Sequence, residues 1–141
     1  MTLHFEIVTP EKVVLKQEAL QVTVPTKQGE ITVLPNHIPL VASLMPGVIE
    51  IMKTDRSLDT MAVSGGFIEV LPDKVVILAD TAERAADIDE ARAEEARQRA
   101  EKLMAEKRED VDFSAVQAKI AKELARVKAV RRHKRHRAEI K

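Results

Sequence analysis

His37 is the first residue whose surroundings suggest chemistry, because a histidine between Pro35 and Pro39 invites a catalytic or metal-binding interpretation. The sequence places no Asp, Cys or His around it at ligand spacing, and it has no serine in a nucleophile-elbow motif. We therefore favour a turn histidine that bonds to nearby backbone. Gly65-Gly66 likewise favours a tight corner between strands, because the Lys-Ser/Thr pair and the helix of a phosphate-binding loop are missing.

The composition excludes several classes of active site. The chain of 141 residues has no cysteine, so no disulfide framework, thiolate nucleophile or zinc–cysteine site is available. It also has no nucleophile–base pair, metal-ligand cluster or Walker lysine, and we predict a non-catalytic protein without a metal. No apolar run approaches the roughly 18 residues needed to span a bilayer. The N-terminus lacks the features of a secretory signal, so a protein made and kept in the cytosol is expected.

Positive charge is concentrated at the C-terminus, although the formal net charge of the whole chain is zero. Residues 1–80 hold 6 Lys/Arg and 10 Asp/Glu, whereas residues 119–141 hold 10 and 2. Three interpretations of this run remain open: a solvated terminus, a nucleic-acid-binding segment, and a segment that enters an acidic groove of a partner protein. Nucleic acid is disfavoured, because the chain has three Phe and no Trp or Tyr to stack on bases. His133 and His136 have a spacing that suits a metal, but the surrounding cations disfavour one.

The first half of the chain must supply the scaffold, and its pattern is that of short strands. Alternating or apolar stretches predict about nine of them, at residues 3–8, 13–15, 19–24, 29–34, 40–44, 48–53, 58–64, 67–71 and 75–79. Pro25 is predicted to end one strand, and Pro46-Gly47 to form a turn. Short strands at such regular spacing indicate an antiparallel sandwich or flattened barrel, whose core must be aliphatic because aromatic residues are so few.

The second half is rich in Ala, Glu and Arg, which favour helix. The first helix is expected from Ile88 to about Arg108, with Asp87 or Asp89 as its cap. Arg92 is placed to pair with Glu95 on the helix surface. The predicted inward face of this helix consists mostly of alanines, with Leu103 and Met104 near its end; the alanines are Ala91, Ala96 and Ala100.

A second helix follows the loop at residues 109–112. Ser114 and Gln117 have the spacing of a capping box at its start. Its apolar side chains step by four, four and three residues along one face, at Val116, Ile120, Leu124 and Val127. The chain is therefore predicted to fold as a mixed β-then-α protein: a flattened antiparallel sandwich in residues 1–86, followed by an antiparallel two-helix hairpin in residues 87–141.

The predicted hairpin is too poor in large side chains to be stable alone. A fully buried large aliphatic residue contributes at most about 1.5–3 kcal/mol, whereas ordering the backbone costs about 1 kcal/mol or more per residue. We therefore expect the hairpin to be stable only when docked, either on the sandwich or on a partner chain. A unit with two docking places is a candidate conformational switch.

Several short motifs occur together and in a familiar order. They are Gly29-Glu30 leading into residues 34–39 (Leu-Pro-Asn-His-Ile-Pro), Pro46-Gly47, residues 63–70 (Val-Ser-Gly-Gly-Phe-Ile-Glu-Val), and residues 79–84 (Ala-Asp-Thr-Ala-Glu-Arg) followed by Ile88-Asp89. With these motifs, which span nearly the whole chain, the sequence resembles the epsilon subunits of the rotary, proton-translocating F-type ATP synthases.

The resemblance implies a sandwich of about ten strands followed by a two-helix domain. It implies a non-catalytic rotor subunit of the central stalk that clasps the gamma subunit and meets the c-ring, with His37 and Pro39 as candidate interface residues. The helices would either fold against the sandwich or extend toward the catalytic alpha and beta subunits and block ATP hydrolysis. Four candidate contacts with those subunits, here called the tail cations, are Arg131, Arg132, Lys134 and Arg135. The protein would be peripheral, on the cytoplasmic side of a bacterial plasma membrane.

Some bacterial members of the family bind ATP through a motif Ile/Leu-Asp-x-x-Arg-Ala, and residues 88–93 match it completely. The resemblance thus implies Asp89 and Arg92 as candidate ATP contacts, with Glu83 and Arg126 as further candidates. No cofactor is required, and ATP is a regulatory ligand in this interpretation. Two alternatives remain beside the rotor subunit: a free-standing nucleotide sensor built from the same parts, and a nucleic-acid-binding module.

Overall fold

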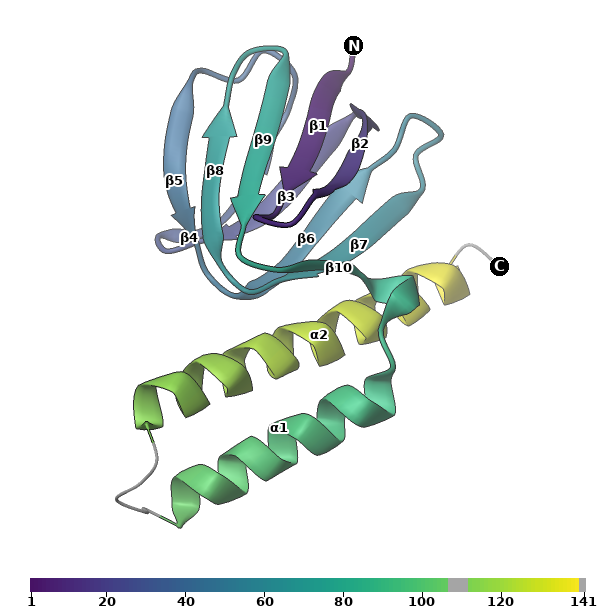
Figure 1. The fold of residues 1–141 in the computed structure, drawn as a ribbon. Coiled ribbons are helices and arrows are strands. Elements are labelled where there is room, and N and C mark those ends of the chain that lie inside the picture. The colour runs from purple at the N-terminus through teal and green to yellow at the C-terminus, as the bar shows by residue number, and fades with distance from the viewer. Residues whose placement is uncertain (107–111, 140–141) are drawn as a thin grey trace.

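A computed structural model describes residues 1–106 and 112–139, and its fold is a β-sandwich followed by two helices (Figure 1). The strands are β1 (Leu3–Val8), β2 (Val13–Ala19), β3 (Gln21–Thr26), β4 (Gly29–Val33), β5 (Leu40–Leu44), β6 (Gly47–Met52), β7 (Leu58–Val63), β8 (Gly66–Val70), β9 (Lys74–Ala79) and β10 (Ala82–Arg84). A short 3-10 turn, η1 (Ala85–Asp87), leads to the helices α1 (Glu90–Ala105) and α2 (Phe113–Glu139). The predicted fold class is confirmed.

One curled sheet contains all ten strands. Its order is β10-β7-β6-β3-β5-β8-β9-β1-β2, and β4 pairs with β3 beside this path. Within the described residues every strand pair is antiparallel except β1 with β9, which run parallel. The curl brings the two halves of the sheet face to face, so that alternate side chains of each strand enter a shared interior (Figure 1).

The interior of the sandwich is aliphatic, as the composition predicts. Phe5 is the one aromatic side chain in this core of described residues, and the others are Leu, Ile, Val, Met and Ala. The largest fully buried side chains come from strands across the sheet; they are Phe5, Leu3, Ile7, Ile49, Ile51, Met61, Ile68 and Ile77. The sandwich therefore has a core of its own, independent of the helices.

Two details of the sheet differ from prediction. Pro25 does not end its strand but lies inside β3, where it pairs with Glu30 of β4. The Pro25 carbonyl accepts a hydrogen bond from the Met45 N–H at 2.9 Å. The Pro25 nitrogen, which carries no hydrogen, faces the same side of β3, where the neighbouring strand changes from β6 to β5. A proline is tolerated there because no ladder bond is lost. The short β10, which pairs only with β7, was not predicted.

The helix caps are set by aspartates. The Asp89 carboxylate accepts a hydrogen bond from the Arg92 N–H at 3.2 Å, so Asp89 is the N-cap of α1. The predicted start at Ile88 is therefore two residues early, and the predicted end at Arg108 lies outside the described residues. At α2 the cap is Asp112, whose carboxylate accepts from two backbone N–H groups, and not the predicted Ser114 box.

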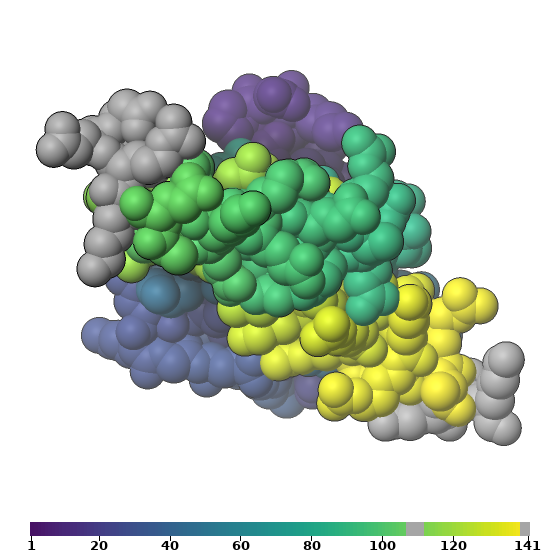
Figure 2. Space-filling model, turned by 90° about the horizontal axis from the view of Figure 1, so that it is seen from below, coloured from purple at the N-terminus to yellow at the C-terminus, as the bar shows by residue number. Residues whose placement is uncertain are grey.

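The hairpin is docked on the sandwich through α2, which lies between α1 and the strands β6 and β7 (Figures 1 and 2). A second, smaller core joins the two parts; its buried members are Val48, Ala62, Ala85, Ile88, Ala93, Val127, Ala129 and Val130. None of the described helices is both long and apolar enough to cross a membrane.

Burial on the helices agrees only partly with the predicted faces. Ala100 and Val127 are buried as predicted, but Ala91 and Leu124 are exposed and Ala96 is half-buried. The reason is that α2 packs against two neighbours at once. Its buried side chains therefore spread around the helix and do not follow a single stripe.

Candidate functional site

A cleft of about 390 Å³ lies at the start of α1, facing α2, and it gathers most of the predicted nucleotide contacts. Its lining residues carry charges of both signs; they are Asp87, Asp89, Arg92, Glu95, Ala96, Arg99 and Arg126. Three of the four candidates therefore meet in one place. The fourth, Glu83, comes from β10 and reaches the cleft through its ion pair with Arg126.

Arg126 joins α2 to the sandwich. Its Nε donates a hydrogen bond to Glu83 at 2.7 Å, and its Nη1 donates one to Glu123 at 2.9 Å. Burial by itself would lower the pKa of Arg126, but the hydrogen bond to Glu123 and the charges of both carboxylates raise the pKa above its ordinary value. Arg126 is thus a permanent cation at the edge of the cleft.

The α1 side of the cleft presents guanidinium groups, which suit phosphate because their planar N–H forks match its oxygens. Arg92 and Arg99 both line it, two helical turns apart on one face. Arg99 was missed by the sequence analysis, although its spacing of seven residues from Arg92 could have revealed it. The predicted pair between Arg92 and Glu95 is not among the ion pairs of the described residues, although both residues line the cleft.

The tail cations form a second cluster, and three of the four are engaged within the chain itself. Arg131 and Lys134 both bind the carboxylate of Glu90 in the first turn of α1, at 3.1 and 2.7 Å. Arg132 binds Glu50 of β6 at 2.7 Å. Hydrogen bonds from Lys134 and then Arg131 hold the pKa of Glu90 below its ordinary value. In the folded posture these cations therefore fasten α2 to α1 and to the sandwich.

Arg132 and Arg135 provide a matched pair for testing this fastening, because Arg135 has no ion pair within the described part of the chain. We expect Arg132→Ala to increase amide exchange in the last third of α2 by roughly three- to tenfold, since a half-buried charged hydrogen bond is lost. Arg135→Ala should change exchange little. Equal protection in the two variants, measured by hydrogen–deuterium exchange, would show that Arg132 does not fasten the helix.

His37 and Pro39 lie in the β4–β5 loop, at the end of the sandwich away from the hairpin (Figure 1). The His37 ring Nδ1 lies 2.6 Å from the Ile38 carbonyl oxygen, so the prediction of a turn histidine bonded to nearby backbone is confirmed. Ile38 and Leu34 of the same loop are exposed apolar side chains. Among the described residues no group of three or more His, Cys, Asp or Glu could hold a metal ion.

The corner at Gly65-Gly66 is also confirmed. Both glycines have positive φ, 117° and 135°, between β7 and β8. A Cβ on Gly66 would lie 2.0 Å from the Leu78 carbonyl oxygen, so only glycine fits where β8 meets β9.

An exposed apolar row crosses the outer face of the sheet, on strands that the hairpin does not cover. Cross-strand pairing aligns one side chain from each of four strands; the row consists of Phe67 (β8), Leu78 (β9), Val8 (β1) and Val13 (β2). Phe67 and Leu78 are 55% and 54% exposed, and Val41 of β5 adds a further exposed side chain nearby. Contiguous exposed apolar groups of this kind mark interaction surfaces.

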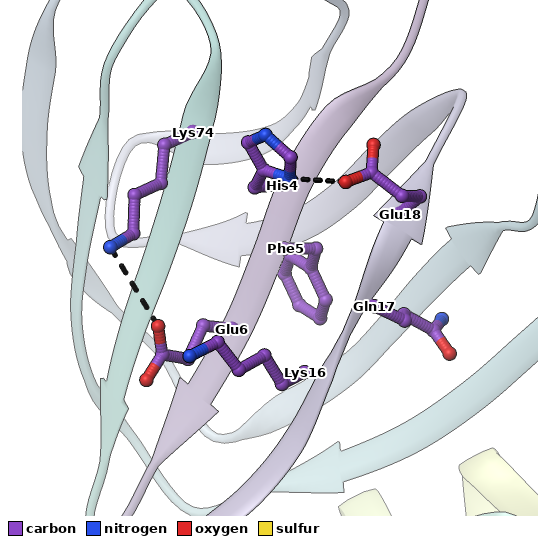
Figure 3. A pocket seen from close by; sticks show the side chains of 7 residues that line it. All are labelled: His4, Phe5, Glu6, Lys16, Gln17, Glu18 and Lys74. Atoms are coloured by element: carbon purple, nitrogen blue, oxygen red, sulfur yellow. Dashed lines mark ion pairs between the residues drawn. The ribbon is translucent and has the colours of Figure 1, made fainter.

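Charged side chains border the apolar row on β1, β2 and β9. A hollow of about 460 Å³ lies there. Figure 3 shows its lining side chains and two ion pairs, one between His4 and Glu18 and one between Lys74 and Glu6. The Lys74 Nζ and the Glu6 carboxylate oxygen lie 3.8 Å apart. Gln17 also lines the hollow, and its buried side-chain Nε2 has no hydrogen-bond partner among the described residues. The paired charges of the hollow form a polar rim beside the apolar row.

Comparison with known families and proteins gives one consistent result. A family model described as the beta-sandwich domain of the ATP synthase Delta/Epsilon chain matches residues 2–85, and one described as its long alpha-helix domain matches residues 86–131. The chain is 46% identical to the ATP synthase epsilon chain of Chloroflexus aggregans over 134 residues, 95% of this chain and 96% of that one. It is 45% identical to that of Moorella thermoacetica over 128 residues, 91% and 96% of the two chains.

Solved structures agree. A chain in the mitochondrial ATP synthase OSCP/F1/c-ring of Euglena gracilis superposes with a TM-score of 0.71 at 25% identity, covering 86% of this chain and 76% of that one. A chain from the central stalk/c-ring of the Tetrahymena thermophila mitochondrial enzyme gives 0.59 at 16% identity, covering 92% and 97%. The second likeness concerns the fold alone.

Proposed function

The chain belongs to the ATP synthase Delta/Epsilon family and is a central-stalk subunit, and we propose that it acts there as a non-catalytic brake on ATP hydrolysis whose release depends on nucleotide. In the folded posture the helices lie on the sandwich and the brake is off. In the extended posture they reach the catalytic alpha and beta subunits. The tail cations then leave Glu50 and Glu90 and pair with acidic groups of those subunits.

The observation that carries this proposal is the small joint between hairpin and sandwich. Seven of the eight buried residues in the second core are Ala or Val, and the eighth is Ile88, which lies with Ala85 between β10 and α1. Each buries little apolar area, so the joint is weak compared with the main core. A ligand that binds only the folded form adds about 2.7 kcal/mol at a hundredfold excess over its Kd. That is enough to decide the balance.

The cleft supports ATP as this ligand. Arg92, Arg99 and Arg126 present three guanidinium groups from two helices, and the match at residues 88–93 includes Asp89. A nucleotide held by both α1 and α2 stabilises only the arrangement in which the two helices lie together. Glu83 of β10 extends that link to the sandwich through Arg126.

The remaining surfaces suit the remaining partners. We assign the apolar row to the gamma subunit, because the hairpin occupies another part of the sheet and leaves the row uncovered. We assign the loop end with His37 and Pro39 to the c-ring, where the exposed Ile38 would make an apolar contact. Held in this way, the protein is peripheral to the cytoplasmic side of a bacterial plasma membrane.

Calorimetric titration of the full chain with ATP tests the nucleotide site. We expect the wild type to bind ATP and Arg92→Ala to bind at least about tenfold more weakly, because a charged hydrogen bond to phosphate is lost. Arg97→Ala is the matched control: Arg97 lies on the same helix but pairs with Glu94 and Glu101 away from the cleft.

Equal ATP affinity in Arg92→Ala and Arg97→Ala would remove the nucleotide site and leave a purely mechanical brake. Co-purification with gamma distinguishes the stalk subunit from a free-standing nucleotide sensor. The third alternative, nucleic-acid binding, would instead show affinity for DNA or RNA that falls steeply with salt.

A further inference from the structure

The Arg126 guanidinium is already hydrogen-bonded to two carboxylates of the chain itself. A guanidinium grips phosphate through two neighbouring N–H donors, either Nε with Nη2 or Nη1 with Nη2. Glu83 takes Nε at 2.7 Å, and Glu123 takes Nη1 at 2.9 Å. The Nε group has a single N–H, so the Nε/Nη2 edge is closed to phosphate while Glu83 is bound. At the Nη1/Nη2 edge the Glu123 carboxylate, bound to Nη1, competes with phosphate for the same guanidinium.

Glu123 is the more persistent of the two competitors. The Glu123 side chain is only 8% exposed, whereas the Glu83 side chain is 39% exposed. A buried carboxylate must keep its partner, because leaving it unpaired in a dry environment costs far more than leaving it in water. Glu123 also lies three residues before Arg126 on α2, so the pair is intact wherever the helix lies. The Glu83 pair, by contrast, exists only when the hairpin is docked on β10.

The charge around the cleft strengthens this competition. Three carboxylates and three guanidinium groups line it, the former being Asp87, Asp89 and Glu95. Glu83 and Glu123 adjoin it through Arg126 and add two further negative charges. The cleft therefore has no surplus of positive charge with which to attract a triphosphate, and loss of one carboxylate charge beside Arg126 should strengthen that attraction.

We propose that Glu123 is a built-in competitor for the phosphates of ATP at Arg126, and that it sets the nucleotide affinity of this chain. The inference rests on the proposed nucleotide site. The Glu123 carboxylate accepts a hydrogen bond from an Arg126 N–H group that a phosphate oxygen would otherwise accept. Binding exchanges one anion for another, so ATP gains less from Arg126 than it would from an unoccupied guanidinium.

Glu123→Gln is the direct test, because glutamine keeps the size of the buried side chain and removes the charge. In calorimetric titrations of the full chain, we expect Glu123→Gln to bind ATP about tenfold more tightly than the wild type, since a charge-assisted bond no longer competes. Glu95→Gln is the matched control. It removes one negative charge from the same cleft without touching Arg126, and should tighten binding less than about threefold.

A double-variant comparison shows whether the gain acts through Arg126. When Arg126→Ala is combined with Glu123→Gln, the gain in affinity should disappear; a gain that persists would overturn the proposal. If Glu123→Gln does not fold, as judged by its thermal melt, Glu123→Asp replaces it. This variant keeps the charge but shortens the reach to Arg126, and should also tighten binding.

The remaining outcomes separate this inference from the nucleotide site itself. Wild-type binding with no more gain in Glu123→Gln than in Glu95→Gln would overturn the competitor while leaving the site intact. ATP binding by Glu123→Gln, with none by the wild type, would support the competitor proposal in its strongest form. Absence of binding in all of the variants would remove the nucleotide site, and this inference with it.

Discussion

Leu78→Asp is expected to abolish detectable association with the gamma subunit while leaving the fold intact. Leu78 stands within the apolar row, with Phe67 beside it on β8 and Val8 on β1. Its side chain is 54% exposed and points away from the core, so the folded chain alone can accommodate an aspartate. In the complex the same carboxylate would be desolvated without a partner, which should weaken association by at least about 100-fold.

Leu124→Asp is the control for this substitution. Leu124 is also an exposed leucine, at 38%, but it lies on α2 and outside the apolar row. Co-expression with gamma followed by affinity capture should recover the Leu124→Asp chain and lose the Leu78→Asp chain. Recovery of both in equal amounts would show that gamma docks elsewhere on the sandwich.

The sandwich could be predicted from sequence because local signals and the global fold agree. Alternating strands such as Leu3–Val8 read directly as half-buried, and Gly65-Gly66 marked its corner correctly. The sequence did not predict in the same way which strands pair with one another. The parallel pairing of β1 with β9 joins strands some seventy residues apart in the chain, and no local pattern encodes it. The prediction that Pro25 ends its strand was wrong for the same reason. Whether a strand tolerates a proline depends on where its two neighbouring strands meet.

The candidate site was predictable only where its residues are close in sequence. Asp89 and Arg92 follow from a six-residue motif, whereas the meeting of Arg126 with Glu83 depends on how α2 docks. Glu123 gave no signal of its own, because a glutamate in a charged helix is expected to be solvated. The pairing of Arg132 with Glu50 was equally hidden. Burial, which decides the chemistry of these charges, is a tertiary property.

Ala129→Leu is expected to release the hairpin from the sandwich. Ala129 is fully buried at 0% exposure in the second core. Three added carbons have no room there, and such overpacking costs about 1–3 kcal/mol. The sandwich has many large buried side chains, so its main core would tolerate a loss of about that much folding free energy. At the small joint it is comparable to the whole free energy of docking, so the population should shift toward the undocked form by roughly ten- to a hundredfold.

Ala118→Leu is the matched control, because it adds the same atoms to the same helix at an exposed position. Limited proteolysis of the isolated chain should cut the helices of Ala129→Leu much faster than those of Ala118→Leu, while the sandwich stays resistant in both. In the assembled synthase, the freed helices should lower ATP hydrolysis, and added ATP should restore it less than in the wild type. If Ala129→Leu is digested no faster than its control, the joint is not weak, and a brake that works by undocking loses its physical basis.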